Sequence, residues 1–472
     1  MRRLFLLVAA SVLTACVGLP YSRPELAIPA QYRYALAETQ GAADTRWWTQ
    51  FDDPALDALV TEALVNSEDL RIAAARVDQF GGAQLTTRAP LFPAIGYGAS
   101  AGRESRSELV YGPGADEAES FASAGLTAGW EIDVWGRVRN LAAAADAEWR
   151  ASEADRRATV LSLVSAVVSG YVSLLSLDEQ LETSRRTLAS RRQALDVFEK
   201  RHRGGVISGV ELSQAQSQYE VAAASIPLLQ QQIAQLENAL SVLVGRNPGP
   251  VVRDRTLVEL QAPTLPAGLP SEILEQRPDV VSAEQSLIAA NARLSAARAL
   301  YYPSISLTGL LGVASLDLDE LFDDGSDTWN YSGSVTGPIF QGGAILGVNR
   351  QAEAQRAQLL ASYEKTVQRA FADVEDALVA TRTTAERNEA QRRQVEALRN
   401  YARLARKRFE GGYSSYLEVL DAESSLFSAE LLYSQGRREQ LLAHVDLYKA
   451  LGGGWVDEAA AQAPQPAAIP AE

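Results

Sequence analysis

Residues 120–136, SFASAGLTAGWEIDVWG, and the segment that follows them up to Arg203 decide the fold. In the first stretch, apolar residues such as Leu126 and Trp130 alternate with Ser, Gly, Thr and Glu, which predicts a strand with one apolar and one polar face. The second stretch contains no Pro and is rich in Ala, Arg, Glu and Leu; as one helix it would extend roughly 100 Å, at about 1.5 Å per residue. A helix of that length cannot be buried within a globule, so we expect an elongated molecule.

A glycine turn and a second helix complete this unit. Gly204 and Gly205 supply a turn after the helix C-terminus, and a new helix is predicted from Gly209 to Val244. Its apolar residues lie alternately three and four positions apart, which is the seam of a coiled coil. They are Ile226, Leu229, Ile233, Leu236, Leu240 and Leu243. The sequence therefore predicts a long antiparallel helical hairpin.

The unit occurs twice in the chain. The Gly204-Gly205 pair recurs as Gly411-Gly412, 207 positions later, and the same shift aligns Gly136 with Gly343. We divide the chain into a signal peptide (1–15), a lipidated N-terminal extended segment (16–52), a first repeat (53–247), a linker with five Pro (248–270), a second repeat (271–455) and a tail (456–472). The tail is rich in Ala, Gln and Pro and is expected to be disordered.

Three more segments show strand periodicity: residues 95–101, 305–313 and 329–339. Four strands of about ten residues suit the tilted wall of a transmembrane barrel, but four cannot close on themselves, so several chains must contribute. The fold class predicted is a mixed α/β membrane protein with long coiled-coil hairpins and four transmembrane strands per protomer. The alternative for these strands is the edge of a soluble sandwich. Trp130, Trp135, Trp329 and Tyr331 suit a membrane-interface belt or ordinary packing.

The N-terminus reads as a targeting segment. Arg2 and Arg3 precede an apolar run too short to span a bilayer, and the segment closes on Leu13-Thr14-Ala15-Cys16. This ending resembles a lipoprotein signal, in which Cys16, the only Cys of the chain, becomes the lipidated N-terminus; the alternative is an ordinary secretory signal with a chance Cys. No later run reaches about 18 uninterrupted apolar residues, so we expect no transmembrane helix.

Charge and composition exclude several function classes. The chain has 472 residues, a formal charge of −15 and a pI of about 4.9, which argues against electrostatic binding of nucleic acid. One Cys, one Met and two His leave no set of soft ligands, so no metal site and no cofactor is predicted. The two Gly pairs follow helices rather than strands and lack the Lys of a phosphate loop, so the chain is not predicted to be an enzyme.

Arg-rich pairs occur on both long helices. Arg185-Arg186, Arg191-Arg192 and Arg392-Arg393 alternate with Glu and Gln, which predicts solvated faces with ion pairs inside each helix.

Several strings resemble the TolC-like outer-membrane efflux factors, in the lipoprotein branch (NodT type) that serves resistance–nodulation–division pumps. They are WTQFDDPALDALVTEALVNSED (48–69), GLPSEILEQRPDVVSAEQSLIAANARLSAARALYYPSISLTG (268–309), GPIFQGG (337–343), YLEVLDAE (416–423) and ALGGGW (450–455). The resemblance covers almost the whole mature chain. It implies a homotrimer with a twelve-stranded barrel in the outer membrane and an α-helical tunnel that crosses the periplasm. It also implies two partners, a periplasmic adaptor (membrane fusion protein) and an inner-membrane pump.

Two sets of site residues follow. The turns between the helices, with Gly204, Gly205 and Val206 in the first repeat and Gly411, Gly412 and Tyr413 in the second, are expected to dock the adaptor; the alternative is that these glycines only cap helices. The resemblance places a pore gate at Leu417, Glu418 and Asp421, where three-fold symmetry would form carboxylate rings; the alternative is a solvated helix start. An Arg that ties the closed tip in some relatives is Ser414 here, so the closing contacts must differ.

Two functions fit these features. One is a passive export duct of the outer membrane, and the other is a lipid-anchored periplasmic coiled-coil protein, structural or adaptor, without a pore. The alternating strands and the duplication favour the duct. The exported substrate, which we expect to bind weakly, stays open between drugs, metals, signals and siderophores.

Overall fold

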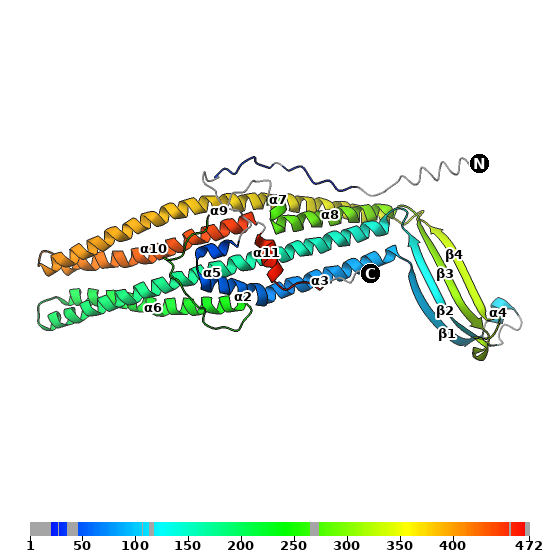
Figure 1. Ribbon diagram of the computed structural model, residues 1–472, viewed down its shortest axis with the longest axis horizontal. Helices are drawn as coiled ribbons and strands as arrows, with labels where there is room; N and C mark the ends of the chain where they lie inside the picture. The colour runs from blue at the N-terminus through cyan, green and yellow to red at the C-terminus, as the bar shows by residue number, and fades with distance from the viewer. Residues whose placement is uncertain are drawn as a thin grey trace.

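The computed structural model describes residues 20–26, 28–34, 46–105, 107–112, 118–264, 273–452 and 455–467. The predicted signal peptide and Cys16 lie outside the described residues. The molecule is elongated, with a sheet at one end, two helical hairpins at the other and short helices beside the middle (Figure 1).

The sheet contains four antiparallel strands in the order β1-β2-β3-β4. They are β1 (Ala94–Glu104), β2 (Glu119–Ile132), β3 (Ser304–Ser315) and β4 (Asp327–Thr336). All four lie where the period-two pattern predicts them. The first two strands belong to the first repeat and the last two to the second.

The strand register separates the two faces as the sequence predicts. On one face, Ser100 Oγ lies 2.9 Å from Ser123 Oγ, and Thr308 Oγ1 lies 2.8 Å from Ser332 Oγ. On the other face, Tyr97 is opposite Leu126, Leu126 is opposite Leu311, and Leu311 is opposite Trp329. Tyr97 and Trp329 are 92% and 67% exposed, so no part of the chain that the structure describes covers the apolar face at these residues.

Each strand pair joins a layer of helices. Helix α3 (Glu68–Arg88) leads into β1, and α8 (Pro278–Ala299) leads into β3. Strand β2 continues into α5 (Arg137–Arg203), and β4 continues into α9 (Ala344–Glu410). In the helical layer that adjoins the sheet, α3 packs on α5, α5 on α8 and α8 on α9. The helices therefore follow the same order as the strands that they join.

The two hairpins form the opposite half of the molecule. Helix α6 (Gly209–Leu243) returns along α5, and α10 (Tyr416–Leu451) returns along α9; α10 also packs on α5. The predicted duplication is therefore visible as two equivalent hairpins. α5 and α9 each contain 67 residues, and both begin after a Gly with a positive φ.

One window of α5 is apolar enough to cross a membrane by length and composition, whereas the sequence was expected to contain no such helix. That window is 67% buried inside the protein. We therefore interpret it as part of the core, where it faces an aromatic cluster.

The middle of the molecule holds this cluster beside α5 and α10. It is built from the 3-10 helix η1 (Trp47–Phe51), α2 (Pro54–Asn66) and α11 (Trp455–Gln462). The ring of Trp47 stacks on that of Tyr448, with ring centroids 5.1 Å apart. Trp455 packs edge-on against Trp47, with ring centroids 6.0 Å apart. The shorter elements are η2 (Ala89–Leu91), α4 (Glu108–Tyr111), α7 (Ile273–Gln276) and η3 (Leu318–Glu320).

The prediction of a disordered tail is wrong for residues 456–467. Helix α11 buries Trp455, Val456 and Ala459 in the middle cluster. Arg156 of α5, itself buried, donates to the carbonyl oxygens of Ala460 and Pro464. Apolar burial and this buried Arg hold a segment whose composition alone resembles a disordered one.

The extended N-terminal segment lies along α8 and α9. Arg23 forms a bidentate ion pair with Glu284 of α8, with Nε–Oε1 and Nη2–Oε2 distances of 2.7 and 2.6 Å. The backbone N–H groups of Arg33 and Tyr34 donate to the carboxylate of Glu375 on α9, at 2.7 and 3.2 Å. We call residues 20–34 the strap. Its residue-20 end lies nearer the sheet (Figure 1).

Candidate functional site

The hairpin tips have the same backbone geometry in both repeats. In the first tip, the N–H of Val206 donates to the carbonyl of Arg201 and the N–H of Gly205 to that of His202, both at 2.9 Å. In the second tip, Tyr413 N–H donates to Arg408 at 2.8 Å and Gly412 N–H to Phe409 at 3.0 Å. This pair of backbone hydrogen bonds is the Schellman motif, which satisfies the last carbonyl groups of a helix.

Glycine is required at one position of each tip. Gly205 has φ +70° and Gly412 has φ +76°, a region that other L-residues rarely adopt. The next residues, Val206 and Tyr413, are 72% and 82% exposed. Each tip thus combines a tight turn that Gly adopts without strain with an exposed apolar side chain.

The helices that leave the two tips begin differently. Ser208 and Glu211 form a capping box at the start of α6, with Ser208 N–H donating to Glu211 Oε2 at 2.8 Å. The equivalent Ser415 makes no side-chain capping bond in α10. Glu418 instead lies 3.7 Å from Arg408 of α9, measured from Oε1 to Nε. The acidic side chain of the second repeat is therefore available for contacts outside its own helix start.

The predicted gate residues lie together on α10. Leu417 is 57% exposed, Asp421 is exposed, and Glu418 is half-buried beside Arg408. Tyr401 of α9 faces both carboxylates, and its pKa is raised by desolvation and then by the charges of Asp421 and Glu418. Glu418 thus has a cationic partner in the same chain, which the sequence did not predict, whereas Asp421 contacts a phenol.

An aromatic joint holds the two hairpins together near the tips. Tyr416 of α10 packs on Phe198 of α5 with ring centroids 4.2 Å apart, and on Phe409 of α9 at 5.1 Å. The guanidinium of Arg201 lies 5.4 Å from the Phe409 ring. Ser414 Oγ is buried and has no hydrogen-bond partner among the described residues. The aromatic contacts therefore join the two hairpins close to Ser414.

The two histidines occupy separate places. His202 is exposed near the first tip, and His444 is buried in α10 with Nδ1 2.9 Å from the carbonyl oxygen of Gln440. Burial lowers the pKa of His444. Within the described ranges, no group of three or more His, Cys, Asp or Glu side chains is arranged to hold a metal ion.

Comparison with known proteins places the chain in a family. The family model of the outer membrane efflux protein matches residues 59–246 and 269–453, which together are most of the chain. The chain belongs to the outer membrane efflux protein family. The two matched ranges correspond closely to the two repeats.

Relatives in this family extend over the whole chain. The probable efflux pump outer membrane protein TtgC of Pseudomonas putida is 37% identical over 99% of this chain and 98% of its own length. The cation efflux system protein CusC of Escherichia coli is 36% identical over 94% of this chain and 97% of its own. The crystal structure of the Campylobacter jejuni CmeC outer membrane channel superposes with a TM-score of 0.89, at 26% identity, over 95% of this chain and 99% of that one.

The resemblance stated from the sequence is therefore confirmed. The protein is an outer-membrane channel of an efflux system, and the reading as a coiled-coil protein without a pore is not supported. The structure brings the tip and gate residues to one end of the molecule, as the duplication predicts. Sequence reasoning did not single out Phe198 and Tyr416, because their contact joins two segments that are far apart in the chain.

Proposed function

We propose that three copies of this chain form the exit duct of a tripartite efflux system, and that the duct docks onto a periplasmic adaptor and an inner-membrane pump. The single observation that carries this proposal is the one-layer architecture of the whole protomer. The strands follow the order β1-β2-β3-β4, and the helices that join them follow the matching order α3-α5-α8-α9. Within the described residues, the outer edges of β1 and β4 are open.

The sheet edges support closure by copies of the chain. Strands β1 and β4 each have one strand neighbour within the described residues, so one row of backbone groups on each faces outward. β1 and β4 run antiparallel in a four-stranded antiparallel sheet, so β4 of one copy can pair with β1 of the next without breaking the alternation. Three copies would give twelve strands with the hydroxyl-rich face inward and the apolar face toward lipid.

The strap supports a lipid anchor at Cys16. The hydroxyl of Tyr21 donates to Glu284 at 3.1 Å, and α8 continues 15 residues from there to its last residue, Ala299, about 22 Å along the helix. The five residues from Tyr21 to Cys16 span at most about 17 Å when extended. An acylated Cys16 would thereby reach the neighbourhood of the sheet, where the inner leaflet of the outer membrane would lie, and two or more acyl chains give durable anchoring.

The tips are the proposed docking surface for the adaptor. They lie at the end opposite the sheet, so they would face the inner membrane when the sheet is in the outer membrane (Figure 1). Val206 and Tyr413 would supply exposed apolar contacts, and Gly204, Gly205, Gly411 and Gly412 would keep the backbone accessible. We test this with Gly205→Val and Gly412→Val, which should abolish export while the oligomer persists in mild detergent. Normal crosslinking of both variants to the adaptor would rule the tips out.

The proposed gate is a ring of Asp421 and Glu418, with Leu417 as the apolar neighbour. In a trimer each residue would occur three times around the axis, and close carboxylates favour cation entry and attract multivalent cations. Because Arg408 partly neutralises Glu418, Asp421 should carry more of the selectivity. The chain acts as a conduit in this proposal, so it is assigned no catalysis and no cofactor.

The cargo is the least constrained element. Relatives from Pseudomonas putida and Escherichia coli are described as proteins of toluene, solvent, antibiotic and cation efflux systems. We propose only that the duct passes what its pump delivers, since the inward face of the sheet carries hydroxyl groups and the carboxylates of Glu104, Glu119 and Glu131 but no site built for one kind of molecule.

The experiment for the proposed function separates a duct from a lipid-anchored rod. Membranes of cells that express the full chain are fractionated, and unheated detergent extracts are compared with boiled ones. A duct should occur in the outer membrane as an oligomer that becomes a monomer only on boiling. An unboiled monomer confined to the inner membrane would overturn the proposal.

A further inference from the structure

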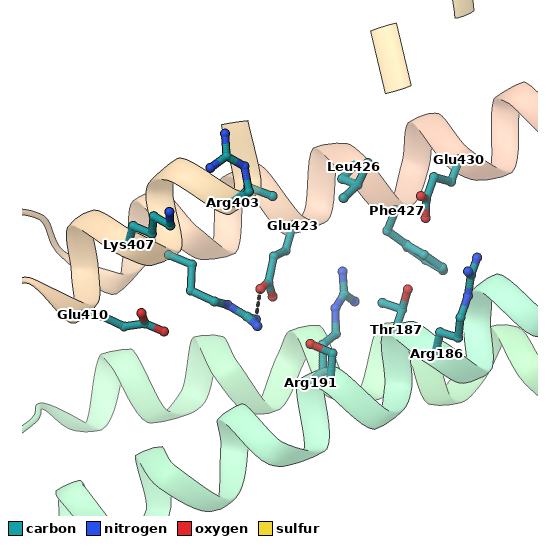
Figure 2. A pocket seen from close by; sticks show the side chains of 13 residues that line it. Arg186, Thr187, Arg191, Arg403, Lys407, Glu410, Glu423, Leu426, Phe427 and Glu430 are labelled. Atoms are coloured by element: carbon teal, nitrogen blue, oxygen red, sulfur yellow. Dashed lines mark hydrogen bonds and ion pairs between the residues drawn. The ribbon is translucent and has the colours of Figure 1, made fainter. Parts of the chain in front are cut away.

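A groove of about 520 Å³ lies between the two hairpins, on the sheet side of their tips (Figure 2). Five cationic side chains line it: Arg186 and Arg191 from α5, and Arg403, Arg406 and Lys407 from α9. Three carboxylates accompany them, from Glu410, Glu423 and Glu430. We call this the hairpin groove. Its lining has two more positive than negative groups, although the whole chain carries a charge of −15.

Most of the carboxylate charge in the groove is already paired. Glu423 forms an ion pair with Arg406, and Glu430 forms one with Arg399 at 2.7 Å. In the part of the chain that the structure describes, no carboxylate lies within 4.0 Å of the charged nitrogen atoms of Arg186, Arg191, Arg403 or Lys407. Four cations therefore line one cavity with one carboxylate outside these ion pairs, Glu410. Arg186 and Arg403 also donate to neutral oxygen atoms of their own helices, Thr183 Oγ1 at 3.2 Å and Asn400 Oδ1 at 2.5 Å.

Arg191 makes this groove unlike an ordinary solvated helix face. It is only 4% exposed, its guanidinium lies 5.2 Å from the ring centre of Phe427, and its Nη1 donates to the carbonyl oxygen of Gln218 at 2.5 Å. A buried guanidinium without a carboxylate partner has lost water that these contacts only partly replace. The interpretation of all Arg pairs as solvated faces is therefore wrong for Arg191. The remaining donors of the guanidinium are available to an anion in the groove.

The groove lies on the side of α10 turned away from the gate. At about 100° per residue, Glu423, Leu426 and Glu430 lie on average roughly 160 to 180° around the helix from Asp421. If Asp421 faces the pore, which rests on the proposed function, the groove opens to the periplasm. Its ligand would then come from the periplasm and not from the transported stream.

We propose that the hairpin groove binds a small multivalent oxyanion of the phosphate class. The planar fork of Arg matches the oxygen atoms of such an anion, and charge-assisted hydrogen bonds are among the strongest available. Its ligands come from α5 in the first hairpin and α9 in the second, so a bound anion ties the hairpins together above the aromatic joint of Phe198 and Tyr416.

The test measures anion binding to the full-length protein purified in detergent. Inorganic pyrophosphate, inorganic phosphate and chloride are titrated at matched ionic strength, with calorimetry and thermal stability as readouts. We expect pyrophosphate to bind more tightly than phosphate, and chloride to give no saturable signal. The variant Arg186→Gln, Arg403→Gln, which changes only exposed side chains, should weaken pyrophosphate binding at least about tenfold. The single variant Arg191→Gln should weaken it as well.

The matched control is Arg382→Gln, an exposed Arg of α9 outside the groove, which should bind as the parent does. Hydrogen exchange locates the site: pyrophosphate should slow exchange in segments 183–191 and 403–410. Equal affinity for the parent and the Arg186, Arg403 double variant would overturn the proposal, as would an equal response to all three anions. Ion conductance of the same preparation in planar bilayers reports the channel separately, so loss of anion binding and loss of pore formation are distinguishable.

Discussion

The ion pair between the strap and α8 gives a sharp quantitative prediction. Arg23 donates two charged hydrogen bonds, of 2.7 and 2.6 Å, to the carboxylate of Glu284, whose side chain is only 9% exposed. In the Arg23→Ala variant, the Tyr21 hydroxyl is the only hydrogen-bond donor from the strap that we expect the buried Glu284 carboxylate to keep. Loss of such a pair in a buried site costs several kcal/mol, but the Arg23 side chain is 43% exposed, so we discount the cost to about 2 kcal/mol.

That free energy should appear as local detachment of the strap rather than as global unfolding. A change of about 2 kcal/mol multiplies the detached population by roughly 30. Hydrogen exchange of the amides of Arg33 and Tyr34, which bond to Glu375, reports this population directly. Their exchange should therefore be faster by about the same factor in the variant.

Two further variants test whether the ion pair between Arg23 and Glu284 holds the strap in place. Glu284→Gln in the Arg23→Ala background should restore most of the protection, because an unpaired amide costs less to bury than an unpaired carboxylate. Glu25→Ala, an exposed change within the strap, should leave the exchange rate unchanged. If Arg23→Ala exchanged at the parent rate, the ion pair would not be what holds the strap.

The other predictions concern the gate, the tips and pH. Asp421→Asn should reduce the cation selectivity of single channels more than Glu418→Gln does, because Arg408 already compensates Glu418; equal effects would contradict the pairing. Gly412→Ala should destabilise the second tip by about 1 kcal/mol, since its φ of +76° is unfavourable for Ala, and thermal melts compared with Gly347→Ala inside α9 would show this. Burial lowers the pKa of His444 below its ordinary 6.5, so the unfolded chain takes up the proton first and stability should fall as the pH drops below about 6.5; His444→Gln should remove that part of the pH dependence of the melting temperature.

Local periodicity predicted much of this molecule. The alternation in β2 and the Pro-free length of α5 were sufficient for the strands and hairpins, because both periods depend only on neighbours along the chain. Helix α11 was missed because its stability comes from packing Trp455 against Trp47 and Trp48, residues far away in sequence. Arg191 was predicted to lie on a solvated face because Arg, Glu and Gln alternate around it, but contacts with Phe427 and Gln218 on other helices bury it.

The site shows the same division between local and distant contacts. The motif Ser-x-x-Glu occurs at Ser208 and again at Ser415, and only the structure shows that the first closes a capping box while Glu418 turns to Arg408. A capping box and an interhelical ion pair use the same residue types, so spacing could not separate them. The gate, the docking tips and Cys16 stay predictions.

Closure of several copies of this chain into a conducting pore is the central claim. Single-channel recording of the full-length protein in planar bilayers tests it directly, with multivalent cations added to the side that the hairpin tips face. We predict discrete cation-selective openings that these ions block from the tip side, and loss of both block and selectivity in the Glu418→Ala, Asp421→Ala variant. A preparation that inserts into the bilayer as an oligomer and conducts no ions, or a double variant that behaves like the parent, would contradict it.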